Sequence, residues 1–213
     1  MIKIIIQVAL AALIVFLGYC IYDSIMQPIR FQNKADWRYE RTKQSLINIR
    51  DAQVAFKSTY GKYTDNFDTL ENFVKNGELK IVKAIGNIPD SFFNKYPRKV
   101  AEMKAIEAGI VRRDTVLVPC YDSLCQGKYI LDSLRYVPLT GGKIFELDTA
   151  SVKTASSIIV PVFEAKAHND VYMLGLDRQE IVNKTDEQTQ NNKYPGLKVG
   201  SLTEINNNAG NWE

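Results

Sequence analysis

Apolar residues dominate the start of the chain and then take on a helical period. Ile4 to Tyr22 carries no charge and one strongly polar residue, Gln7. A run of this length meets the roughly 20 apolar residues that a helix needs to cross a bilayer. Between Ile29 and Tyr60 the apolar residues recur instead at steps of three or four, as an amphipathic helix requires. The clearest of these are Leu46, Ile49, Ala52, Phe56 and Tyr60.

The two patterns predict one rod with a bend in it. We expect a transmembrane anchor over residues 1–27 and an amphipathic helix, continuous with it, over residues 28–60. Pro28 lacks an amide hydrogen and its ring collides with the preceding turn, which predicts a kink there. Gly61 follows the last periodic residue and is expected to end the helix.

The remainder, residues 61–213, is predicted to form one α+β domain. Helices are expected over 68–75, capped by Asp68 and closed by Gly77, over 97–108, and within the polar segment 177–192. Alternating apolar residues predict strands, and Gly141-Gly142 predicts a hairpin between two of them. The predicted strands are 79–85, 116–118, 128–131, 135–139, 143–148, 158–163, 171–176 and 197–202. The predicted fold class is therefore a long kinked N-terminal helix packed on an antiparallel β-sheet.

The N-terminus is consistent with three kinds of segment: a cleaved signal peptide, a lipoprotein signal and a retained anchor. Tyr19 is too bulky for the position before either cleavage site, so we expect a retained anchor. Small residues within it suggest a surface on which another membrane helix packs closely. These residues are Ala9, Ala11, Ala12 and Gly18.

Charge and cysteines give conflicting signals for orientation. Lys3 precedes the anchor, but more positive residues follow it, and this excess by itself favours a cytoplasmic domain. Cys120 and Cys125 form a candidate disulfide, which suits an oxidising compartment, although two free thiols are the alternative. The net charge of +3 is mild, and no basic stripe interleaved with aromatics indicates nucleic acid as a partner.

Motifs for catalysis are missing from the sequence. There is no nucleophile elbow, phosphate loop or dinucleotide fingerprint. The single histidine, His168, is expected to be solvated rather than a metal ligand, and the acidic residues are scattered. We therefore expect a protein that is not an enzyme, with no cofactor, no metal and no catalytic residue.

The segment Ile49 to Tyr63, followed by Phe67 to Leu70, resembles the end of the long helix and the turn in type IV pilins and type II secretion pseudopilins. The resemblance covers roughly the first seventy residues and implies a pilin-like fold with a periplasmic domain on a bacterial inner membrane. The tail, Tyr194 to Leu202 and Gly210 to Glu213, resembles that of uncharacterised envelope proteins of Bacteroidota-type bacteria. The basic leader and the helix glutamate of prepilins are not found here, so filament formation stays open.

Two functions are consistent with these patterns. The first is a subunit or scaffold of an envelope assembly or secretion-type machine, with copies of itself or other membrane-anchored envelope proteins as partners. The second is a membrane-tethered module that binds a glycan or a peptide through its sheet and tail, where Tyr194 and Trp212 supply aromatic surface.

Overall fold

The computed structural model describes residues 2–85, 88–125, 133–154 and 156–213. The chain is α+β, with one very long helix at its N-terminus and small antiparallel sheets. It divides into two compact units, which the sequence did not reveal. Unit 1 combines Met1–Arg50 with Arg135–Glu213, and unit 2 is Asp51–Leu134.

Helix α1 runs from Ile2 to Tyr60, as the periodicity predicted. It continues as helix through Pro28, so the proline does not break it; the kink itself stays a prediction. Gly61 ends the helix with φ +75°, and its amide donates to the carbonyl of Lys57 at 2.8 Å. This left-handed residue is the usual glycine stop of a helix.

The sheet of unit 1 has three antiparallel strands in the order β3-β4-β5. Their bounds are Glu146–Lys153, Ile159–His168 and Gly196–Gly200. Strand β4 is central and pairs with β3 from Glu146↔Lys166 to Lys153↔Ile159 and with β5 from Glu164↔Gly200 to His168↔Gly196. Its alternate residues Phe163, Ala165 and Ala167 are buried and form one wall of the core.

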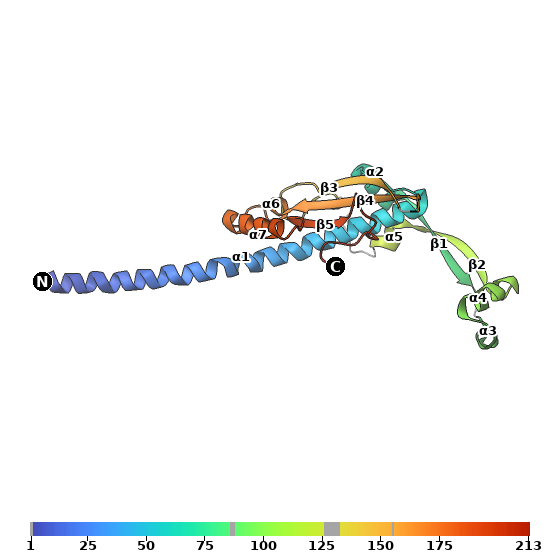
Figure 1. Cartoon of the computed structure of the whole chain (residues 1–213), viewed down its shortest axis with the longest axis horizontal. Helices are drawn as coiled ribbons and strands as arrows, with labels where there is room; N and C mark the ends of the chain where they lie inside the picture. The colour runs from blue at the N-terminus through green and yellow to red at the C-terminus, as the bar shows by residue number, and fades with distance from the viewer. Residues whose placement is uncertain (1, 86–87, 126–132, 155) are drawn as a thin grey trace. The chain divides into compact units, whose positions relative to one another are not determined.

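Two helices follow β4 in unit 1 (Figure 1). Helix α6 is a single turn, Asn169–Tyr172, capped by the side chain of His168. Helix α7, Arg178–Gln190, is capped by Asp177, whose carboxylate accepts the amides of Gln179 and Glu180. Tyr172 and Met173, at the end of α6, are completely buried in the core.

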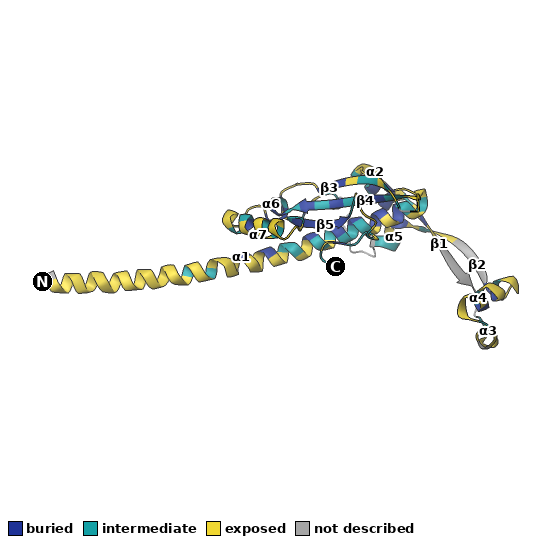
Figure 2. Cartoon of the chain, in the orientation of Figure 1, coloured by how far each residue is buried: buried dark blue, intermediate teal, exposed yellow. Residues whose placement is uncertain are grey.

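Helix α1 contributes a stripe to the core of unit 1. Phe31, Ala35, Thr42, Leu46 and Ile49 are buried and recur at helical spacing. The Arg38 guanidinium adds a polar link, because it donates to the carbonyls of Tyr172 at 3.4 Å and Leu174 at 2.6 Å. The first half of the helix is exposed, and the buried residues begin at Phe31 (Figure 2).

Unit 2 begins in the last turns of α1 and contains a two-stranded ribbon with short helices. Helix α2 spans Phe67–Asn76, and strands β1 (Glu78–Ile85) and β2 (Arg112–Pro119) pair antiparallel from Glu78↔Pro119 to Ile85↔Arg112. Helices α3 (Asp90–Lys95) and α4 (Arg98–Glu107) lie between these strands in the sequence, and α5 (Cys120–Cys125) follows β2.

The core of unit 2 is built on an aromatic cluster. The ring of Phe56 lies 4.7 Å from that of Tyr60 and 5.2 Å from that of Phe73, between centroids. Gln53 is fully buried, and its side chain exchanges two hydrogen bonds with the backbone of Thr64. These bonds fix the turn after α1, since a buried amide needs its partners.

Several local predictions were wrong. Helix α2 is capped by Asn66, whose Oδ1 accepts the amides of Asp68 and Thr69, so the cap lies two residues before the predicted Asp68. Segment 171–176, predicted as a strand, is the end of α6 and a turn, because the cap at His168 starts a helix instead. Segments 135–139 and 143–148 meet only at the bridge Tyr136↔Ile144 before β3 begins at Glu146.

Other strands were found but with different bounds. Strands β2 and β4 extend well beyond the predicted 116–118 and 158–163, since pairing with a neighbour sets their length. The predicted strand 128–131 lies outside the described residues. Gly141 and Gly142 both have positive φ and form the turn of the bridged loop, as expected.

Candidate functional site

The exposed apolar surface of α1 is the most prominent surface feature of the described residues. Side chains around the whole circumference of its first half face outward, among them Ile14 (67% exposed), Val15 (73%) and Phe16 (60%). This helix, near the N-terminus, is the one described helix that is long and apolar enough to cross a membrane. Water would not favour such a surface on a folded protein, so it calls for an apolar environment or partner.

The small residues of this segment do not all share one side of the helix. At about 100° per residue, Ala11 and Gly18 lie within about 20° of each other, whereas Ala9 lies nearly opposite. Nothing lies within 4 Å of a Cβ placed on Gly18. The predicted packing surface therefore reduces to Ala11 and Gly18, with Ala12 at its side and Ala9 turned away.

A polar cleft of about 400 Å³ lies where the apolar segment ends. One wall is the side of α1 that carries Asp23, Gln27, Arg30 and Lys34, and the other is the turn between α6 and α7 up to Asp177. Two hydrogen-bonded contacts order it. The Gln27 amide donates to the Asp177 carboxylate at 2.8 Å, and the Arg30 guanidinium lies 3.3 Å from the Asp23 carboxylate.

One carboxylate of this cleft, that of Asp177, has a lowered pKa. The hydrogen bond from Gln27, followed by the backbone amide of Glu180, holds the pKa of Asp177 below its usual value. The carboxylates of Asp23 and Asp177 and the cationic side chains of Arg30 and Lys34 line the same open space. Sequence reasoning missed this cleft because Asp177 and Gln27 are 150 positions apart.

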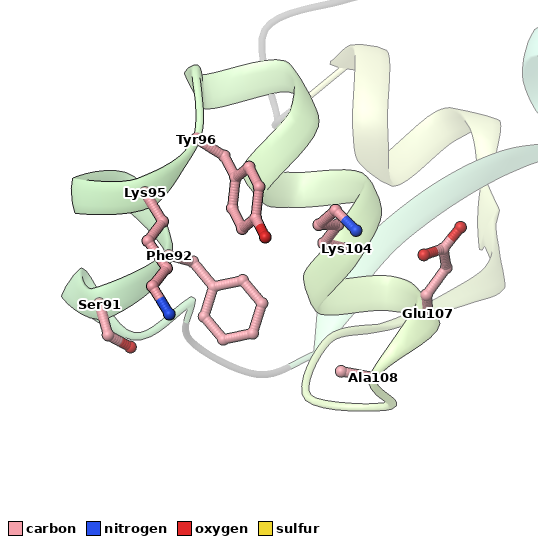
Figure 3. Close-up of a pocket in the computed structure, with 7 residues that line it drawn as sticks. All are labelled: Ser91, Phe92, Lys95, Tyr96, Lys104, Glu107 and Ala108. Carbon is pink, nitrogen blue, oxygen red and sulfur yellow. The ribbon is translucent and has the colours of Figure 1, made fainter.

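A second pocket, of about 470 Å³, lies between α3 and α4 in unit 2. Figure 3 shows the rings of Phe92 and Tyr96 on the α3 side, with Lys104 and Glu107 on α4 across from them. The Lys104 ammonium lies 5.3 Å from the centroid of the Tyr96 ring, a cation–π distance. The volume is within the range of small-molecule sites.

Of the residues noted in the sequence, His168 and the tail aromatics are parts of the fold. His168 accepts the amide of Asp170 through Nδ1 at 3.2 Å, and its ring contacts that of Tyr194 edge-on. Burial raises the pKa of Tyr194 to about 12. Trp212 is half-buried, and its ring lies so close to Gly210 that a Cβ there would come within 2.3 Å of it. These aromatics are packed rather than displayed.

Cys120 and Cys125 stand at the two ends of α5, and Cys120 is buried. The side chain of Cys125 lies outside the described residues, so the predicted disulfide is untested. Five residues of α-helix advance about 7.5 Å, farther than a disulfide normally spans between Cα atoms, so a bond would require α5 to open.

No group of three or more His, Cys, Asp or Glu side chains that could hold a metal ion occurs within the described ranges. Comparison of the chain with protein-family models, with curated proteins and with solved structures gives no match.

Proposed function

We propose that this chain is a single-pass membrane protein whose folded part acts as a structural subunit or scaffold of a bacterial envelope assembly. The observation that carries the proposal is the continuity of α1. One helix is apolar and exposed from Ile4 to Tyr22, and between Phe31 and Ile49 it buries one stripe of its residues in the core of unit 1. A rigid helix that runs from the membrane into the domain fixes the orientation of the domain relative to the membrane.

The contacts after the anchor support a domain held close to the membrane surface. Gln27 donates a hydrogen bond to Asp177, and Arg38 donates to the carbonyls of Tyr172 and Leu174. These bonds hold the C-terminal part of unit 1 on α1 within a few turns of the apolar segment. A domain on a flexible linker would behave differently, because its orientation would be lost. The resemblance to pilins and pseudopilins of the segment around Ile49 to Tyr63 supports the same proposal and a periplasmic placement.

Membrane insertion is tested with lysines placed at the centre of the anchor. Leu10→Lys with Ile14→Lys introduces two charges that each oppose insertion by about 2.5–3.5 kcal/mol. We expect this variant to leave the membrane fraction under alkaline carbonate, whereas the full chain resists extraction. Asn33→Lys with Gln44→Lys adds the same charge to exposed positions of α1 and should stay membrane-bound.

The assembly role is tested by crosslinking in intact cells and purification through a tag after Glu213. A stoichiometric set of membrane-anchored partners, or copies of the chain, is the expected result. A reporter active only in the periplasm, fused at the same place, tests the orientation. A monomer without membrane partners would contradict the scaffold, and a silent reporter would contradict the periplasmic placement.

A tethered ligand-binding module is the second candidate, and the pocket between α3 and α4 is the observation that favours it. Its two aromatic rings and two lysines, Lys95 and Lys104, would suit an anionic ligand with a flat apolar part, such as an acidic glycan or peptide. Saturable binding of such a ligand that is lost in Tyr96→Ala, together with no stoichiometric partner in crosslinking, would favour this function over the scaffold.

A further inference from the structure

The polar cleft lies at a defined position along α1, directly after the apolar segment. Lys3 and Asp23 are the first charged residues on either side of the apolar segment. Twenty residues of helix advance about 30 Å, the thickness of the hydrocarbon core of a bilayer. If α1 crosses the membrane, as proposed above, Asp23 stands at the border between hydrocarbon and headgroups.

Arg30 is two turns beyond Asp23, yet its charge is at the same depth. The Arg30 Nη1 atom lies 3.3 Å from Asp23 Oδ1, so the side chain extends back along the helix toward the apolar segment. Side chains on a helix lean toward its N-terminus, and long cationic chains place their charged ends at the lipid headgroups. Both side chains are about half exposed, so the guanidinium remains accessible to a further anion.

The opposite wall adds a second carboxylate, that of Asp177, to the cleft. Gln27 is one turn after Asp23, and its amide holds the Asp177 carboxylate at 2.8 Å. Lys34 completes the lining of the cleft from α1. The cleft thus presents two cations and two anions around a space of about 400 Å³, and its net charge is zero.

A neutral cleft that carries charges of both signs matches zwitterionic lipid headgroups. We propose that this cleft binds a phospholipid with a primary ammonium group, of the phosphatidylethanolamine type. Arg30 and Lys34 bind the phosphate, and Asp23 and Asp177 accept hydrogen bonds from the ammonium. An ammonium donates three such bonds and a quaternary choline none, so the carboxylates provide selectivity. The inference rests on the proposed membrane anchoring and assigns a lipid to the place where the domain meets the bilayer.

The test uses the full chain in nanodiscs of dioleoyl phosphatidylethanolamine, phosphatidylcholine and phosphatidylglycerol in equal parts. Native mass spectrometry counts the lipids retained when the protein is released. We expect phosphatidylethanolamine to exceed phosphatidylcholine by at least about threefold, and a threefold factor corresponds to about 0.7 kcal/mol of preference. Equal retention of these two lipids would overturn the inference.

Two variants separate the roles of the charges. Asp23→Asn with Asp177→Asn should abolish the preference for phosphatidylethanolamine over phosphatidylcholine and increase retention of phosphatidylglycerol, while the asparagine introduced at position 177 still caps α7. Arg30→Gln with Lys34→Gln should lower retention of all three lipids. Arg41→Gln with Lys43→Gln removes the same charge from α1 outside the cleft and should change nothing; an equal loss in this control would show non-specific attraction and overturn the site.

Two further measurements test whether the bound headgroup belongs to a membrane lipid and whether the chain is anchored in the membrane. Soluble O-phosphoethanolamine should not displace the lipid, because the anchor holds the cleft among lipids at high local concentration. If O-phosphoethanolamine displaces the lipid at a concentration comparable to that of the lipid, the proposal that the cleft binds a membrane lipid is wrong. Carbonate extraction of the same proteins separates the two proposals: release of the full chain refutes anchoring and this site together, whereas retention without lipid preference refutes the lipid site alone.

Discussion

Truncation of Leu46 tests whether α1 is an integral part of the folded domain. Leu46 lies in the buried stripe of α1 and has no exposed surface. Leu46→Ala removes three carbon atoms from the core, worth about 0.8 kcal/mol each in transfer free energy, and leaves a cavity that adds to the loss. We expect the free energy of unfolding of unit 1 to fall by about 3 kcal/mol, within the roughly 2–5 kcal/mol typical of such changes.

The measurement is thermal unfolding of the full chain in detergent micelles. For a domain of this size, about 4 °C per kcal/mol predicts a decrease in Tm of roughly 12 °C. Fluorescence of Trp212, which is half-buried in unit 1, reports the transition, after the contribution of exposed Trp37 is removed by Trp37→Phe in all proteins.

Gln44→Ala on the exposed side of the same helix is the matched control, and its effect should stay within about 0.5 kcal/mol. Equal Tm values for Leu46→Ala and Gln44→Ala would show that α1 does not pack in the core of unit 1. That result would refute the continuity of membrane helix and domain on which the proposed function depends.

Three further predictions concern local features. Asn66→Ala removes the cap of α2 and should destabilise unit 2 by about 0.5–2 kcal/mol, measured in denaturant, whereas Asn66→Ser should be nearly neutral. Gly200→Ala should destabilise unit 1 strongly, because Gly200 has φ +78° and a Cβ would come within 2.1 Å of the carbonyl oxygen of Phe163; an unchanged Tm would contradict this geometry. Because burial raises the pKa of Tyr194 to about 12, above the unfolded value near 10, the folded state holds its proton longer, and stability should fall as the pH rises between these values. Tyr194→Phe should weaken that alkaline loss, and identical pH profiles would refute the assignment.

The sequence by itself determined the longer helices, α1, α2, α4 and α7. The periodicity from Ile29 to Tyr60, the stop at Gly61 and the polar segment that became α7 were all found with little error, because a helix satisfies its hydrogen bonds within a few residues. Its side-chain pattern and its end signals are therefore local. The length of the apolar segment could also be read directly from the sequence, because it depends only on which residues are apolar.

Strand pairing and the division into units were decided only by the tertiary structure. Strand β4 is longer than its apolar pattern suggested because β3 and β5 pair with it along both edges. Segment 171–176 has a strand-like sequence, but its first two residues belong to α6, which His168 caps. Tyr172 in this helix is buried in the core. Residues from both ends of the chain meet in unit 1, where Gln27 bonds to Asp177. Contacts over such separations leave no periodic signal in the sequence, because their partners are chosen by shape and burial in three dimensions.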